Sequence, residues 1–232
     1  MKNKKTVKSQ KQRIKNLVLA GMFTALAYVV MLIFRIKVQF LTFEFKDAIM
    51  TIGAMICGPV YAVVMSFVTA FIELITVSDT EIYGFIMNFV SSVAFTFPAA
   101  LIYKYKRNIY GAITGTITAV FTMTAVMLAA NLIITPHYYH IDIAGVVKMI
   151  PTLLLPFNLT KAVLNAGVVL LFYKPISQAL KKAHLISGAG EEGRKFNVRT
   201  TVIVSVVAVI LIAASIAVFL IVLRGNITLG AS

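Results

Sequence analysis

Tryptophan is absent from the chain, cysteine occurs once, and only eight of the 232 residues are acidic. With the single Cys57, an intramolecular disulfide is excluded. Without tryptophan, tyrosine and phenylalanine must supply any aromatic belt at a membrane surface. Charged residues make up 13% of the chain, whereas 59% of its residues are hydrophobic. A soluble domain of this length cannot bury so much apolar surface, so the composition predicts a polytopic all-α membrane protein.

Several catalytic motifs are also missing. The sequence has no G-x-x-x-x-G-K-[ST] loop for ATP, no H-E-x-x-H pair for zinc and no G-x-S-x-G elbow,. An intramembrane enzyme is disfavoured because no nucleophile–base pair stands out. We therefore expect a protein that is not an enzyme and that carries no ATPase motifs.

The net charge of +14 raises the alternative of a nucleic-acid-binding protein. We reject it because the basic residues cluster at the N-terminus and between apolar runs, as membrane topology requires. The expected environment is the lipid bilayer, with no nucleic-acid partner.

Seven apolar runs are candidate membrane spans, and a span needs roughly 20 residues. They cover residues 16–34, 47–58, 60–76, 83–103, 110–134, 150–173 and 199–223. The second run is short and stops at Gly58-Pro59. Each span must satisfy its backbone hydrogen bonds internally, so helices are expected, and no strand-type alternation is seen.

The runs divide the chain into five parts. A basic arm (1–15) precedes a six-helix membrane domain (16–180), and a flexible linker (181–198) leads to an extra transmembrane helix (199–223) and a tail (224–232). If every run spans, sixteen Lys and Arg residues fall on one side of the membrane and five on the other. The positive-inside rule then predicts a cytoplasmic N-terminus in the cell membrane, and an extracellular C-terminus if the seventh run spans.

Polar side chains within the apolar runs are the candidate site. Asn158 and Lys161 are three residues apart and share a helix face, and a lysine inside a span is costly enough to suggest a function. We expect the sixth helix to begin at Pro156, which places Lys161 near the outer surface together with Asn131. The alternative is that Lys161 extends to the interface and that both amides join helices.

Two further segments are candidates for the same pocket. Residues 38–47 alternate aromatic and polar side chains, so Phe40, Leu41, Thr42 and Phe43 are expected to form a lid over a flat ligand; the alternative is an aromatic belt with solvated charges. Asn88 lies in the fourth run, where pocket lining and interhelical hydrogen bonding are equally open.

The remaining charged residues are assigned less specific roles. We expect Glu73 and Asp79 to be solvated near the outer surface, although Glu73 could pair with a pocket cation. Two histidines and Asp142, in the sequence His137-Tyr138-Tyr139-His140-Ile141-Asp142, could ligate a metal. They lie in a loop without fixed geometry, so no metal site is predicted.

Small residues in the first run form a possible docking face for another membrane subunit. Gly21 and Ala25 make one small-xxx-small pair, and Ala20 and Thr24 make a second pair beside it,. Packing inside the chain is the alternative.

Four motifs, taken in order, resemble those of a known family: Phe40–Ala48, Gly58-Pro59, Pro98–Arg107 and Leu155–Lys161. About residues 14–180 look like a riboflavin-specific S-component of energy-coupling factor (ECF) transporters. This resemblance implies a six-helix protein that captures a vitamin from outside, and partners comprising a transmembrane T-component and two ATPase subunits. Riboflavin is then a transported substrate, and no cofactor is expected.

The resemblance also implies residue roles. The family's flavin-binding Asn and its Asn-x-x-Lys correspond to Asn131, Asn158 and Lys161, and its A-x-x-x-A docking motif corresponds to Gly21 and Ala25. The seventh run departs from the six-helix pattern. Alternatives are an S-component for thiamin, folate or pantothenate, or a standalone secondary carrier.

Overall fold

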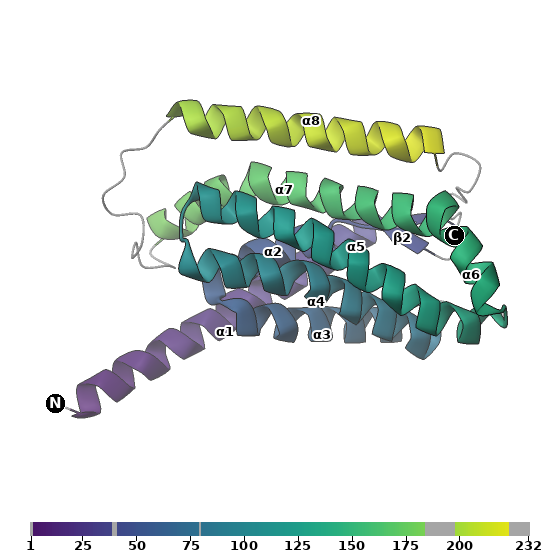
Figure 1. The fold of residues 1–232 in the computed structure, drawn as a ribbon. Coiled ribbons are helices and arrows are strands. Elements are labelled where there is room, and N and C mark those ends of the chain that lie inside the picture. Colours follow the sequence, from purple (N-terminus) through teal and green to yellow (C-terminus); the bar gives the residue numbers. More distant parts are fainter. Residues whose placement is uncertain (1, 39–40, 79, 184–197, 223–232) are drawn as a thin grey trace.

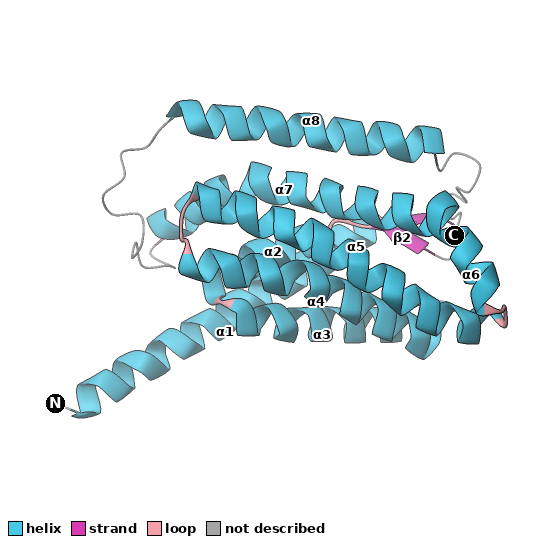
Figure 2. Ribbon diagram, in the orientation of Figure 1, coloured by secondary structure: helices cyan, strands magenta, loops and turns pink. Residues whose placement is uncertain are grey.

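The computed structural model describes residues 2–38, 41–78, 80–183 and 198–222. The described residues are almost entirely helical, with one short β-hairpin (Figure 2). The elements are α1 (Lys2–Ile33), β1 (Ile36–Val38), β2 (Leu41–Phe43), α2 (Lys46–Cys57), α3 (Pro59–Thr76), α4 (Glu81–Tyr105), α5 (Ile109–Tyr139), α6 (Ile143–Met149), the π-helical segment η1 (Ile150–Leu154), α7 (Leu155–Lys182) and α8 (Val198–Val222).

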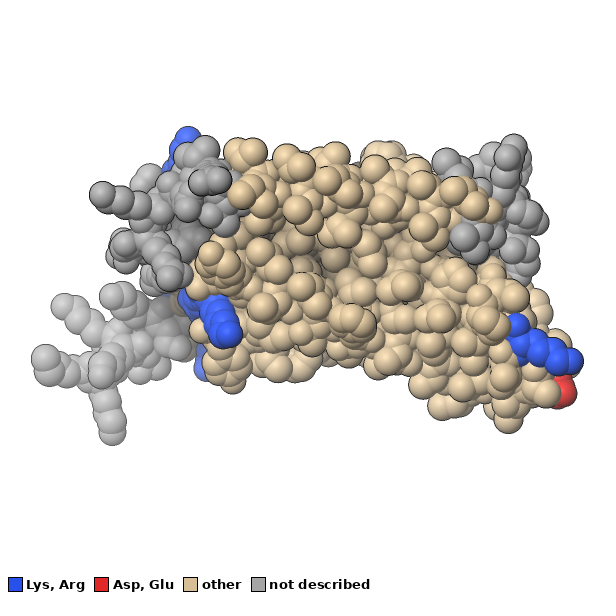
Figure 3. All heavy atoms as spheres, turned by 45° about the horizontal axis from the view of Figure 1, so that its top comes forward, with Lys and Arg blue, Asp and Glu red and all other residues tan. Residues whose placement is uncertain are grey.

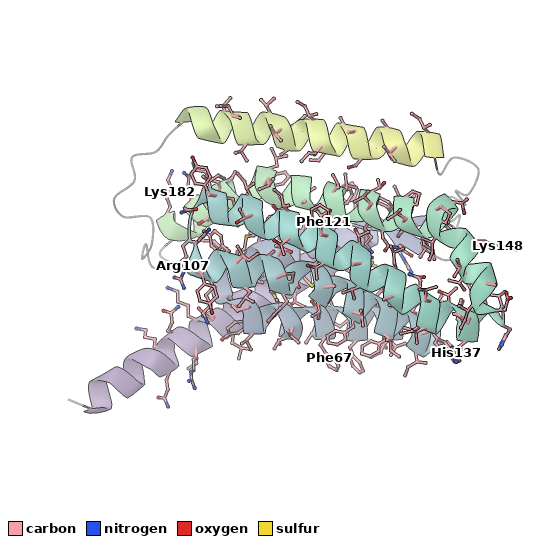
Figure 4. The ribbon with its side chains drawn as sticks, viewed as in Figure 1. Phe67, Arg107, Phe121, His137, Lys148 and Lys182 are labelled. Atoms are coloured by element: carbon pink, nitrogen blue, oxygen red, sulfur yellow. The ribbon has the colours of Figure 1, made fainter. Side chains whose placement is uncertain are left out.

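The long helices lie side by side in one bundle, and the first turns of α1 project from one end (Figure 1). Helix α8 runs beside α7, which it contacts, at the edge of the bundle. The α2–α3 junction and the α4–α5 loop lie at the end from which α1 projects. This end carries Arg107 and Lys182, and we call it the basic end (Figure 4). The hairpin and α6 lie at the opposite end, which we call the hairpin end.

Five helical segments are long and apolar enough to cross a membrane. They are Gln10–Ile33, Pro59–Thr76, Glu81–Tyr105, Ile109–Tyr139 and Ile143–Leu180. On the face drawn in Figure 3, Lys and Arg lie at the two ends of the bundle and uncharged residues cover the surface between them. The predicted fold class is therefore confirmed: the protein is an all-α, multi-pass membrane protein.

One predicted span, α2, is shorter than a bilayer crossing needs, whereas α8 has 25 residues. Helix α2 has only 12 residues and is buried along most of its length, so it lies inside the bundle. The apolar part of α8 covers Val202–Val218 within the described residues. Most of the predicted linker, residues 184–197, and the predicted tail lie outside the described residues, and the predicted domain boundaries remain predictions.

The start of the last bundle helix was predicted wrongly. Helical backbone begins at Ile143, where Asp142 caps α6 by accepting a hydrogen bond from the Gly145 amide at 3.0 Å. It then continues through η1 into α7. Proline lacks an N–H group and cannot make the usual helical hydrogen bond. The wider π turn contains Pro151, and Pro156 follows in the first turn of α7,, so Lys161 lies well inside a continuous helix.

The β-hairpin was also not predicted. Strands β1 and β2 pair in antiparallel register, with Ile36 opposite Phe43 and Val38 opposite Leu41. Each strand has only three residues, and the alternation of residues 38–47 was interpreted as a lid segment and not as a strand.

Helix α1 packs into the bundle through a stripe of side chains four residues apart. Leu19, Phe23, Ala27 and Met31 are all buried, which is the spacing of one helix face. A Cβ at Gly53 would lie only 2.7 Å from the Phe23 ring. Glycine at this position therefore allows α2 to approach α1 closely.

Candidate functional site

Four charged side chains meet inside the hairpin end of the bundle. Glu44, Lys46, Glu73 and Lys161 are each at most 5% exposed. Lys46 Nζ lies 2.6 Å from Glu73 Oε1 and 2.8 Å from Glu44 Oε1. Lys161 Nζ donates to the same Glu44 oxygen at 3.1 Å. We call these four residues the buried charge cluster, and in it two ammonium groups neutralise two carboxylates.

The cluster joins three separate parts of the chain. Glu44 and Lys46 follow strand β2, Glu73 lies in the last turn of α3, and Lys161 lies on α7. Burial alone would raise the pKa of Glu44, but the ammonium groups of Lys161 and Lys46 lower it to about 2. Glu44 is therefore ionised and tied to α7, so the cluster fixes the end of the hairpin against the bundle.

Asn165 strengthens this connection one turn along α7. Its Nδ2 donates to the Glu44 carbonyl at 3.0 Å, and its Oδ1 accepts from the Ala48 amide at 2.9 Å. One fully buried amide thus satisfies backbone groups on both sides of the turn between β2 and α2.

Replacing Asn165 with alanine is expected to lower the free energy of unfolding by about 1–3 kcal/mol, because the buried Glu44 carbonyl loses the Asn165 amide and the Ala48 amide keeps only its longer bond to the Phe45 carbonyl, at 3.2 Å,. The measurement is thermal unfolding of the detergent-purified protein. Asn108→Ala is not a matched control for burial, since Asn108 caps α5 and is half-buried. Asn158→Ala is the better control, because the Asn158 side chain is also buried but its hydrogen bond is to a carbonyl one turn back in the same continuous helix. An equal or larger loss for Asn158→Ala would contradict the special role of Asn165.

Helix α4 adds polar groups beside the cluster. Asn88 Nδ2 donates to Glu73 Oε2 at 2.7 Å, and Ser92 Oγ donates to Asp47 Oδ1 at 2.6 Å. Asp47 Oδ2 and Ser91 Oγ are buried without a hydrogen-bond partner in the described structure. One polar atom on α2 and one on α4 thus remain available for a further hydrogen bond.

A cavity of about 240 Å³ opens next to these groups at the hairpin end. Its polar wall includes Glu73, Asn88, Asn158 and Lys161. Its other sides are lined by two hairpin residues, Leu41 and Thr42, and by four aromatic side chains, Tyr83, Tyr138, Tyr139 and Phe157. Such a mixture of directed polar groups and flat apolar surface suits a planar heterocycle with polar edges.

Five of the eight predicted substrate-binding residues line this cavity: Leu41, Thr42, Asn88, Asn158 and Lys161. Asn158 Nδ2 donates to the Leu154 carbonyl at 2.8 Å, which leaves the Asn158 Oδ1 without a partner in the described structure. Phe43 is buried behind the wall, edge-to-face with Phe157 at 5.2 Å. Phe40 lies outside the described residues.

Asn131 is not among the cavity-lining residues. Its Nδ2 donates to the Met127 carbonyl at 2.7 Å, and its Oδ1 accepts from Thr135 Oγ1 at 3.0 Å. Both ends of this fully buried amide are thus used inside α5, whereas Met127 and Thr135, one turn on either side, do line the cavity. A direct role for Asn131 in binding stays a prediction that the geometry does not favour.

The expectation that Glu73 is solvated was wrong. Glu73 is 3% exposed, and Glu44 and Asp47, whose charges would be solvated in the aromatic-belt alternative, are 2% and 0% exposed. Lys46 supplies the cation that makes burial of the two glutamates tolerable. The sequence did not point to Lys46 or Asn165, because their partners are distant in the chain and no local spacing links them. In the described part of the chain, no three His, Cys, Asp or Glu residues lie close enough to hold a metal.

Residues 15–173 match the family described as the substrate-specific component of ECF transporters. The chain belongs to this family. It is therefore an S-component, a class of substrate-binding transporter subunits, which confirms the resemblance noted in the sequence.

Two curated relatives and one solved structure are similar to this S-component. It is 31% identical to a riboflavin transporter, RibU, of Staphylococcus aureus (strain TCH60), over 74% of this chain and 95% of the relative. It is 23% identical to a riboflavin transporter, FmnP, of Bacillus subtilis (strain 168), over 75% of this chain and 99% of the relative. A solved S component of a bacterial ECF transporter superposes with a TM-score of 0.61 and 27% identity, covering 72% of this chain and 98% of that structure.

The four predicted docking residues of the S-component fall into two pairs. Ala20 and Thr24 are 3% and 7% exposed and face the interior, so their burial does not support a docking role. Gly21 and Ala25 are exposed, and a Cβ added at Gly21 would meet no atom within 4 Å. Only the second pair is available to a partner, and its role stays a prediction.

Proposed function

We propose that this S-component captures riboflavin in the hairpin-end cavity and delivers it to an ECF T-component and two ATPase subunits, which supply the energised step. The observation that carries the proposal is the cavity wall of Asn88, Asn158 and Lys161 facing aromatic side chains. It is supported by two relatives that are named riboflavin transporters.

The chemistry of the cavity matches the two parts of riboflavin. The isoalloxazine ring has a uracil-like edge with alternating acceptors and one N–H group. Asn158 Oδ1 can accept from that N–H, and the ammonium group of Lys161 can donate to a ring carbonyl or to N1. Tyr83, Tyr138 and Phe157 offer faces for the ring, while Glu73 and Thr42 can bond the ribityl hydroxyls.

Riboflavin entry requires some rearrangement of the cavity. The volume of about 240 Å³ is below the ~300–1,000 Å³ of typical ligand pockets. Leu41 and Thr42 form one side of the cavity, so an outward shift of these two residues, with the strand still held at Glu44, enlarges it. This is the lid role predicted from the sequence.

We further propose that the hairpin end faces the cell exterior and that the basic end is cytoplasmic. Lysine and arginine concentrate on the cytoplasmic side of membrane proteins. The basic end carries the N-terminal arm, Lys104, Lys106, Arg107 and Lys182. With this orientation the riboflavin cavity opens toward the extracellular side, from which the substrate arrives.

Titration of free riboflavin with the purified protein tests the substrate, because bound flavin should lose fluorescence. We expect quenching with the unaltered protein, and the variant Asn158→Ala should weaken binding by about 1–3 kcal/mol, since the flavin N–H is left unpaired. Asn108→Ala, at the opposite end of the bundle, is the control and should bind normally. Absence of quenching in the unaltered protein would favour another vitamin.

Uptake by cells distinguishes the capture subunit from a standalone carrier. The proposal requires co-expressed T-component and ATPase subunits for riboflavin uptake. Uptake by this chain alone, stopped by a protonophore, would favour the carrier.

A further inference from the structure

A second cavity, of about 470 Å³, opens at the basic end, far from the riboflavin cavity. It lies between the N-terminal half of α1, the α2–α3 junction and the α4–α5 loop. Its polar lining consists of Gln12, Asn16, Tyr61, Lys104 and Arg107. None of these residues takes part in the proposed capture of riboflavin.

This basic-end cavity carries unbalanced positive charge. Lys104 and Arg107 are exposed and have no acidic partner among the described residues. The described Asp and Glu residues are all at the hairpin end of the bundle: Glu44, Asp47, Glu73, Glu81 and Asp142. The first turn of α3 also lines the cavity, and the N-terminus of a helix adds positive potential. The cavity therefore favours an anionic group.

The surroundings place this cavity at the depth of lipid headgroups. Tyr105 and Tyr110, next to the two cations in the chain, are 76% and 57% exposed, and exposed tyrosines collect at the membrane–water interface. Val60 lines the cavity and is 70% exposed, and Val64, one turn further along α3, is also exposed. A polar hollow thus sits directly at the end of an apolar strip.

We propose that the basic-end cavity binds the phosphate headgroup of an anionic membrane lipid. Arg107 can contact two phosphate oxygens at once, and Lys104 adds a second positive charge. The acyl chains lie along α3 over Val60 and Val64. Basic pockets between membrane-spanning helices bind anionic headgroups in this way. A lipid can contact both the polar cavity and the apolar strip on α3, whereas a soluble anion can contact only the cavity.

Native mass spectrometry of the full-length protein in detergent tests this lipid site. The protein is titrated with phosphatidylglycerol and, separately, with phosphatidylcholine that has the same acyl chains. We expect a preference for phosphatidylglycerol. The double variant Lys104→Gln/Arg107→Gln should lower the affinity for phosphatidylglycerol at least about tenfold, because each basic residue near a membrane contributes a factor of about five.

Lys106→Gln is the matched control, since Lys106 is in the same loop and has the same charge but does not line the cavity. It should keep the preference, and so should the charge-conserving double variant Lys104→Arg/Arg107→Lys. Riboflavin quenching reports separately that each variant is folded. An equal loss with Lys106→Gln, or no preference in the unaltered protein, would overturn the proposal. Full competition by glycerol phosphate at equal concentration would instead identify a free-phosphate site and would also overturn it.

Discussion

Replacing Lys46 with methionine is expected to lower the free energy of unfolding by about 3–5 kcal/mol, the usual cost of removing one partner from a buried ion pair. Lys46 Nζ donates to both Glu73 oxygens, at 2.6 and 2.7 Å, and also contacts Glu44. Methionine fills similar space but leaves the Glu73 carboxylate with only the Asn88 amide as a partner. The measurement is the melting temperature of the detergent-purified protein, followed by circular dichroism.

Two comparisons separate loss of pairing from loss of packing. Lys148→Met removes an exposed lysine at the same end of the bundle and should leave the melting temperature almost unchanged. The double variant Lys46→Met/Glu73→Gln removes both charges and keeps an acceptor for Asn88. It should recover at least half of the lost stability, because Glu44 remains paired with Lys161. If the two substitutions destabilise additively, the Lys46–Glu73 pair contributes nothing specific.

The helices were predictable because lipid exposure leaves a strong and local signal. The runs 60–76, 83–103 and 110–134 fall within α3, α4 and α5, since a span must be apolar over its whole length. The hairpin and the early start at Ile143 were not predictable in this way. The alternation in residues 38–47 covers strands of only three residues, and Pro156 does not start the helix because helical backbone continues into it through the π segment that contains Pro151,.

The site was predictable only where a polar residue lies inside an apolar run of the sequence. Lys161 and Asn158 stand out inside an apolar run, and both reach the cavity. Asn131 stands out equally, but its amide bonds within α5, and spacing cannot distinguish these two outcomes. Glu73 was expected at the surface because its neutralising partner, Lys46, is 27 residues away. Charge pairing across that separation depends on the tertiary fold, which no local pattern encodes.

Introducing leucine at Gly21 is expected to abolish riboflavin uptake in cells that express the complete transporter, while leaving riboflavin binding intact. Gly21 is exposed on α1, and a Cβ placed there meets no atom within 4 Å. The isolated S-component therefore accommodates a larger side chain, and leucine even favours the helix by up to about 1 kcal/mol over glycine. A partner helix that packs closely against Gly21 and Ala25 cannot tolerate it. Uptake of labelled riboflavin and co-purification of the T-component are the two measurements.

A graded series at this position distinguishes a docking face from an unrelated defect. Gly21→Ala restores two small residues four positions apart and should keep uptake, whereas Ala25→Leu should act like Gly21→Leu because the two residues lie one turn apart on the same exposed face,. Thr118→Leu adds a similar bulk to an exposed position on α5 and should be neutral. Since binding and uptake are measured on the same variants, loss of both would indicate damage to the fold. Normal uptake with leucine at both positions would show that partners dock elsewhere on the bundle.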